Sequence, residues 1–140
     1  MNARANAALS KYQNVSAATG VTDATPHRLI QMLMEGALAR IAAARGHMVH
    51  GDPAARGEQI GWAISIISGL QACLDMEQGG EISHNLDALY DYMVRRLGEA
   101  SANNDPSILD EVAGLLGEIK SAWDQLPARL AQEQRRAAAS

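Results

Sequence analysis

The sequence contains little of what stabilises small secreted, metal-bound or β-rich proteins. Its 140 residues include one cysteine, four prolines and no phenylalanine, and aromatic residues make up 4% of the chain. A single cysteine cannot form an intrachain disulfide, and no spacing of cysteine and histidine resembles a zinc site. Hydrophobic residues nevertheless make up 47% of the chain, and most of them are aliphatic or alanine. This composition favours helices over sheets.

The sequence also lacks a long apolar segment and a basic stripe. No uninterrupted apolar run approaches the roughly 20 residues of a membrane span, and residues 1–6 lack the apolar region of a signal peptide. The net charge is −4, and the arginine pairs at 95–96 and 135–136 are isolated, whereas a nucleic-acid-binding protein needs a cationic surface for the phosphates. We therefore expect a cytoplasmic protein that neither inserts into a membrane nor binds nucleic acid.

Proline and glycine mark where helices begin. Three prolines follow a residue whose side-chain oxygen can cap a helix: Thr25-Pro26, Asp52-Pro53 and Asp105-Pro106. The glycine pair at 79–80 ends one helix and turns the chain into the next, and Pro127 is expected to stop the last helix. The predicted helices are residues 26–49, 53–78, 81–102 and 106–126.

Connections as short as these force consecutive helices to run antiparallel. At 140 residues the chain has the length of one domain. We predict an all-α fold, an antiparallel up-down-up-down four-helix bundle with flexible N- and C-terminal tails. The predicted boundaries are a flexible arm at 1–20, the bundle domain at 21–127 and a flexible tail at 128–140.

Apolar residues recur at spacings of three and four on one face of each helix, as the core of a bundle requires. In the third helix the expected stripe is Ile82, Leu86, Leu89, Met93, Leu97 and Ala100. Three helices carry further apolar or small residues in separate rows: Leu29, Met32, Gly36, Ala39 and Ala43 in the first, Trp62, Ile66, Gly69 and Cys73 in the second, and Leu109, Leu116 and Trp123 in the fourth. A second row must be buried against neighbouring helices, the N-terminal arm, a second copy of the chain or a foreign apolar segment.

Two histidine patterns raise other functions. Glu81 and His84 have the spacing of di-iron bundle ligands, but that site needs a second such pair and two further glutamates, so we expect no metal and no cofactor. His84 and Leu86 also match part of the pattern of histidine phosphotransfer bundles. In those proteins an exposed histidine is followed by any residue and then by Leu-Lys-Gly. Here Asp87 and Ala88 stand at the positions of the lysine and the glycine, and an aspartate repels phosphate. A phosphotransfer bundle that uses His84 is the alternative function, and we expect no enzyme activity.

The amino-acid sequence of several segments resembles that of a known family, the flagellin export chaperones called FliS. Gly-Gly-Glu-Ile at 79–82, Asn-Leu at 85–86 and Leu-Tyr-Asp-Tyr-Met at 89–93 carry the resemblance most clearly. Thr-Pro-His-Arg-Leu-Ile at 25–30 is similar to the opening helix of the family, and the resemblance extends from about residue 12 to residue 123. The chain departs from the family at 34–35, where Met-Glu replaces an aromatic residue and an aspartate.

The resemblance implies a cytoplasmic chaperone that acts in flagellar type III export. Such proteins bind the C-terminal segment of flagellin, which is disordered in the free monomer, in apolar grooves of the bundle and so prevent premature polymerisation. Some relatives also contact the export gate or regulatory proteins, and a homodimer is compatible with the extra apolar rows. The residues expected to contact the partner are Tyr12, Leu29, Met32, Gly36, Trp62, Ile66, Gly69, Leu86, Tyr90, Leu109, Leu116 and Trp123.

The N-terminal arm generates a first testable prediction. Its large apolar side chains are Leu9, Tyr12 and Val15, and a tethered arm meets a nearby groove at high effective concentration. If the arm covers the groove in the absence of flagellin, deletion of residues 1–15 increases dye binding or self-association and alters flagellin affinity. Tighter binding identifies Tyr12 as a competitor, and weaker binding identifies it as part of the site. No change in dye binding, association or affinity would leave the arm without this role.

Overall fold

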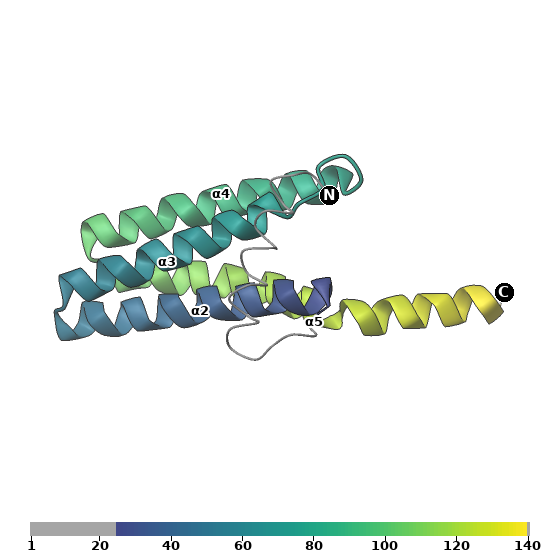
Figure 1. Ribbon diagram of the computed structural model, residues 1–140, viewed down its shortest axis with the longest axis horizontal. Coiled ribbons are helices and arrows are strands. Elements are labelled where there is room, and N and C mark those ends of the chain that lie inside the picture. The colour runs from purple at the N-terminus through teal and green to yellow at the C-terminus, as the bar shows by residue number, and fades with distance from the viewer. Residues whose placement is uncertain (1–24, 140) are drawn as a thin grey trace.

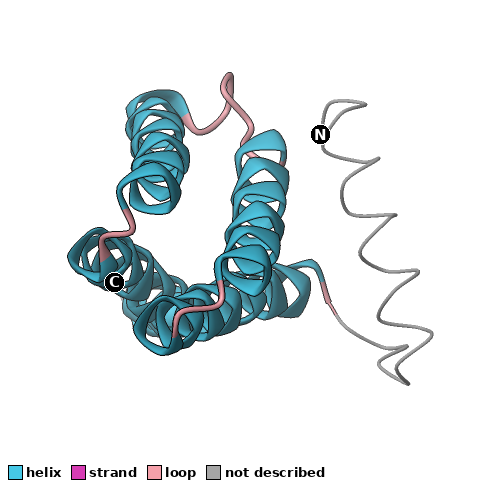
Figure 2. Cartoon of the chain, turned by 90° about the vertical axis from the view of Figure 1, so that its left-hand side faces the viewer, coloured by secondary structure: helices cyan, strands magenta, loops and turns pink. Residues whose placement is uncertain are grey.

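The computed structural model describes residues 25–139, which form four helices. They are α2 (Pro26–His50), α3 (Pro53–Ala72), α4 (Gly80–Asn103) and α5 (Pro106–Ala139), as Figure 1 shows. Consecutive helices pack against each other, and α2 also packs against α5, so that the four helices surround one apolar core (Figure 2). The predicted all-α, antiparallel up-down-up-down bundle is confirmed. Within residues 25–139, no helix is both long and apolar enough to cross a membrane.

The three predicted capping residues all cap a helix. Thr25 and Asp52 each accept a hydrogen bond from the backbone amide three residues on, at 3.1 Å in both cases. Asp105 accepts from the Ser107 amide at 2.9 Å and from the Ser107 hydroxyl at 2.7 Å. These bonds satisfy amides that have no partner within the helix, so short-range chemistry alone sets the starts of α2, α3 and α5.

The end of α3 differs from the prediction, because the helix stops at Ala72 and not at residue 78. The Asp75 carboxylate accepts from the backbone amides of Glu77 at 3.2 Å and Gln78 at 3.0 Å. A short polar side chain that bonds nearby amides offers the backbone an alternative to the helix. The chain therefore leaves the helix before it reaches the glycine pair.

This turn closes tightly on the start of α4. A Cβ atom on Gly79 would lie 1.7 Å from Ser83 Oγ and 2.8 Å from the Asp75 carbonyl oxygen, so glycine is needed there. The next residue, Gly80, has a φ of 54°, a conformation that glycine adopts readily. Ser83 is 7% exposed and takes the inward position in the first turn, while Ile82 is 72% exposed. The prediction of Ile82 as a core residue is therefore wrong.

The core contains side chains from all four helices. The largest fully buried ones are Leu29, Met34, Ile41, Ile67, Met93, Leu97, Leu109, Leu116 and Val112. In α4 the predicted stripe is correct for Met93, Leu97 and Ala100, but Leu89 is only partly buried. Tyr90 is 3% exposed instead, and burial, with a smaller contribution from Cys73, raises its pKa to about 12.

Ion pairs join α5 to the helices on either side. Arg45 of α2 donates to both carboxylate oxygens of Asp110, at 2.7 and 3.3 Å. Arg96 of α4 donates to Glu111 at 2.8 Å, and the Tyr92 hydroxyl donates to the same carboxylate at 2.9 Å. The Arg96 and Tyr92 hydrogen bonds lower the pKa of Glu111. Such exposed pairs add little stability.

The last helix also differs from the prediction, since α5 continues through Pro127 to Ala139. The expected stop at Pro127 is wrong, and residues 128–139 form an exposed extension that projects beyond the bundle (Figure 1, yellow). The predicted arm at 1–20, with Leu9, Tyr12 and Val15, lies outside the described residues. The domain boundaries at 20 and 127 stay predictions.

The core yields a second prediction. Leu97→Ala removes a side chain that is 0% exposed, so we expect a loss of about 2–5 kcal/mol in the free energy of unfolding. Leu89→Ala, which sequence periodicity alone would favour as the test, is expected to cost less. Ile82→Ala serves as a surface control within about 0.5 kcal/mol of the parent protein. Urea denaturation measures all three, and equal losses for Leu97→Ala and Ile82→Ala would contradict the described rotation of α4.

Candidate partner-binding surface

The outer face shared by α2 and α3 brings together several of the predicted site residues. A Cβ atom on Gly36 of α2 would lie 3.6 Å from the Ile66 side chain of α3, which places the two residues side by side. One turn further along α2, the Arg40 guanidinium lies over the Trp62 ring at 5.5 Å from its centroid. These two contacts set the antiparallel register of the helices on this face.

Residues three and four apart lie on the same side of a helix, so Met32 of α2 and Gly69 of α3 continue the same line, one turn beyond Gly36 and Ile66. We call this line the α2–α3 seam. It comprises Met32, Gly36, Trp62, Ile66 and Gly69. Trp62 is 53% exposed, and the other four are half-buried. The seam is thus an apolar line that is open to solvent along the side of the bundle.

Arg40 holds the most exposed member of the seam in place. Besides lying over the Trp62 ring, it donates a hydrogen bond to Gln59 at 3.2 Å, one turn earlier on α3. A cation over an exposed indole contributes about 0.5–1 kcal/mol. The indole is therefore oriented on the surface before any partner arrives, which lowers the conformational entropy lost on binding.

The seam glycines have no packing role among the described residues. A Cβ atom on Gly69 would meet none of their atoms within 4 Å, and one on Gly36 would make ordinary contact with the end of Ile66. Glycine inside a helix costs roughly 0.5–1 kcal/mol relative to alanine. The bundle as described accommodates alanine at both positions, so the effect of these glycines is to leave the backbone of α2 and α3 uncovered.

The remaining predicted site residues lie elsewhere. Four of them are at most 3% exposed and present no surface in the described bundle: Leu29, Tyr90, Leu109 and Leu116. Contact between these four and a partner would require the bundle to open. Leu86 is partly buried against the core, and Tyr12 lies outside the described residues. The partner contacts of all the predicted residues stay predictions.

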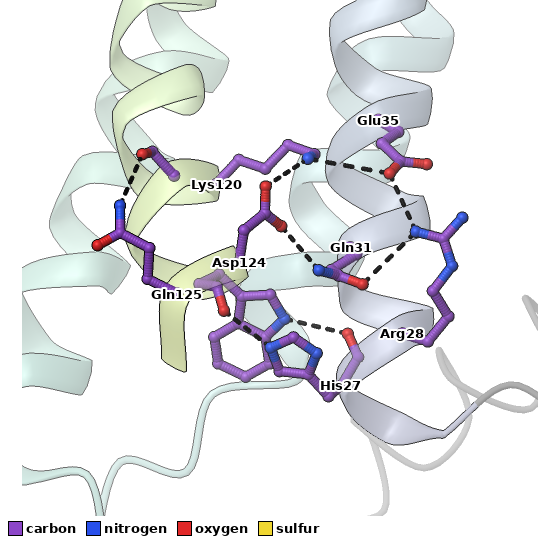
Figure 3. Close-up of polar contacts among 9 residues, drawn as sticks. His27, Arg28, Gln31, Glu35, Lys120, Asp124 and Gln125 are labelled. Carbon is purple, nitrogen blue, oxygen red and sulfur yellow. Dashed lines mark hydrogen bonds and ion pairs between the residues drawn. The ribbon is translucent and has the colours of Figure 1, made fainter. Parts of the chain in front are cut away.

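Trp123 of α5 lies against His27 in the first turn of α2, in the region drawn in Figure 3. Its ring stacks on His27 with centroids 4.8 Å apart and planes inclined by 9°. Its indole Nε1 donates to the His27 carbonyl at 3.0 Å, and His27 Nε2 lies 2.8 Å from the Trp123 carbonyl oxygen. Because a carbonyl oxygen only accepts, His27 Nε2 carries the proton. Sequence reasoning missed His27.

A polar network surrounds this pair and holds α2 against α5 (Figure 3). Gln31 donates to Asp124 at 2.8 Å, and Lys120 lies 2.7 Å from Asp124 and 3.9 Å from Glu35. Arg28 completes the network with an ion pair to Glu35 at 3.0 Å. The hydrogen bonds from Lys120 and Gln31 lower the pKa of Asp124. One side of α2 is thus polar and bound to α5, while the seam side is apolar and open.

The chemical alternatives gain no support from the geometry. Within the part of the chain that the structure describes, no three His, Cys, Asp or Glu residues are placed to hold a metal ion. His84 is exposed on α4, and the Asp87 carboxylate accepts from Gln71 at 2.8 Å. Asp87 therefore stays at the position where a phosphotransfer protein would carry a cation.

Comparison with known proteins assigns the chain to a family. The family model described as "Flagellar protein FliS" matches residues 8–130. The chain is 55% identical over 117 residues to flagellar secretion chaperone FliSB of Pseudomonas aeruginosa, which covers 84% of this chain and 93% of that protein. Over 119 residues it is 47% identical to flagellar secretion chaperone FliS of Salmonella typhimurium, covering 84% and 88% of the two chains. The FliS of Vibrio cholerae is 45% identical over 119 residues, covering 85% and 88%. With a match across most of its length, the chain belongs to the FliS family.

Proposed function

We propose that this chain is a cytoplasmic export chaperone that binds the disordered C-terminal segment of flagellin along the α2–α3 seam. Binding would prevent premature polymerisation and keep flagellin ready for flagellar type III export. The general role is supported by the family, since the relatives compared above are named flagellar secretion chaperones. The observation that carries the choice of surface is Trp62, which is 53% exposed at one end of an apolar line.

The energetics of such a complex favour a site built around Trp62. A disordered segment loses conformational entropy when it folds on its partner, so the interface has to bury a large apolar area in compensation. Covering about 100 Å² of indole surface contributes on the order of 2–3 kcal/mol. Tryptophan is also among the residues on which binding energy most often concentrates.

The seam glycines suit a partner whose backbone comes close. Gly36 and Gly69 leave the α2 and α3 backbones uncovered, with Ile66 between them as an apolar contact. A helix or extended strand laid along the seam can approach at these two points more closely than over any larger side chain. The same reasoning explains why the bundle retains glycine where alanine would stabilise it.

The proposed activity is binding, and no catalytic step forms part of it. Delivery of flagellin requires that the complex meet the export apparatus, so a contact with the export gate follows from the proposed role. Pairing of two seams in a homodimer is the competing use of this surface. The two uses exclude each other at the same residues, and therefore self-association should fall when flagellin binds.

The site is tested by Trp62→Ala. We expect the affinity for a peptide of the flagellin C-terminal segment to fall about 10- to 100-fold, because the partner loses the largest apolar contact on the seam. Isothermal titration calorimetry measures the affinity, and circular dichroism checks that the helices persist. Ile82→Ala is the matched control, since Ile82 is 72% exposed but lies on α4. A Trp62→Ala affinity within threefold of the parent would rule out the seam as the main site.

The glycine argument has its own test in Gly69→Ala and Gly114→Ala. Neither new Cβ atom meets a described atom within 4 Å, so both variants should gain about 0.5–1 kcal/mol of stability. We expect only Gly69→Ala to weaken flagellin binding, because Gly114 lies on α5 away from the seam. Denaturation and calorimetry on the two proteins separate the effects. Equal affinities in both variants would show that the partner backbone does not approach α3 at Gly69.

A further inference from the structure

A proline in the interior of a helix normally interrupts it, yet α5 continues through Pro127. Proline has no backbone N–H, so it cannot donate to the carbonyl four residues earlier. In α5 that carbonyl belongs to Trp123. Without another donor it would be left without its helical partner, which is one reason why a helix stops or kinks at proline.

The missing donor is present, and it comes from another helix. His27 Nε2, in the first turn of α2, lies 2.8 Å from the Trp123 carbonyl oxygen and donates to it. The contact is reciprocal, because the Trp123 indole donates to the His27 carbonyl at 3.0 Å and the two rings stack. The two residues are 96 positions apart in sequence, so the contact connects the start of α2 to the carbonyl that Pro127 leaves without a helical donor.

We propose that His27 replaces the hydrogen bond that Pro127 deletes, and that this clamp makes the C-terminal extension of α5 conditional on the docking of α2. Residues 128–139 are exposed and include Leu130 at 48% exposure, so the bundle core gives them little support. A helix of that length is marginal in water when it is alone. Continuity with the rest of α5 across Pro127 therefore contributes to the order of the first turn of the extension.

The clamp is a conformational device, since it has two states with different consequences. While His27 contacts Trp123, the carbonyl is satisfied and the helix continues beyond the bundle. If the start of α2 moves away, the carbonyl loses its partner and the helix is expected to fray from Pro127 onward. An event at the start of α2 would thus be transmitted to the end of the chain.

The stacking of the rings could hold α5 without the hydrogen bond, and two substitutions separate these effects. His27→Phe retains an aromatic ring for stacking but removes the donor. Pro127→Ala restores a backbone N–H that can donate to the Trp123 carbonyl within α5. If the proposal is correct, His27 matters far more when residue 127 is proline than when it is alanine. His84→Phe, at an exposed position on α4, controls for the added ring.

The first measurement is a double-mutant cycle by urea denaturation of the full-length chain. We expect His27→Phe to lower the folding equilibrium constant about 5- to 10-fold in the Pro127 protein and less than about 2-fold in the Pro127→Ala protein. Equal losses in the two backgrounds would overturn the proposal, because they would show that the His27 donor does not compensate for Pro127.

The second measurement is amide hydrogen exchange in the extension, which reports local opening without unfolding the protein. We expect exchange at residues 128–131 to be at least about 5-fold faster in His27→Phe than in the parent. Adding Pro127→Ala to His27→Phe should return the exchange rate to that of the parent. The His84→Phe control should exchange like the parent. Unchanged exchange in His27→Phe would overturn the link between the start of α2 and the extension.

Discussion

The structure depends on the burial of one apolar face from each of four helices at a common centre. Each helix contacts two neighbours, so each has two flanks occupied and one side left over. Side chains such as Met93 and Leu97 are completely covered by this arrangement. Apolar residues beyond the one buried face have no place inside the bundle. The presence of Trp62 on the surface is therefore a consequence of a core that is already complete.

A feature of the fold could be predicted from the sequence when the residues that cause it lie close together along the chain. The starts of α2, α3 and α5 follow from Thr25, Asp52 and Asp105, whose bonds span two or three residues, and sequence reasoning found them. The end of α3 also has a local cause, the hydrogen bonds of Asp75 to the amides of Glu77 and Gln78. The glycine pair at 79–80 is the stronger helix-stop signal in the sequence, and it predicts an end that is too late. The continuation of α5 could not be predicted in this way, because its donor, His27, is brought to Trp123 only by the folded bundle.

The candidate site shows a different limit. Periodicity correctly groups residues that share a helix face, and it brought Trp62, Ile66 and Gly69 together in one row. It gives no information on which row turns toward the centre, because that depends on the rotation of each helix against its neighbours. Leu29 and Leu109 belong to rows that periodicity sets apart from the core stripe, and both are nevertheless buried. Contacts between helices, such as that of Gly36 with Ile66, show how α2 and α3 are rotated against each other.

The helix α2 shows how one bundle combines stability with an open surface. One face enters the core, a second face carries Gln31 and Glu35 toward α5, and a third presents Met32 and Gly36 to the seam. The hydrogen bonds and ion pairs with α5 lie on a different flank of α2 from the seam. A partner that bound along the seam, as proposed, could therefore cover its apolar residues without competing for the hydrogen bonds and ion pairs between α2 and α5. The polar residues that join α2 to α5 and the apolar residues of the seam are thus different residues of the same helix.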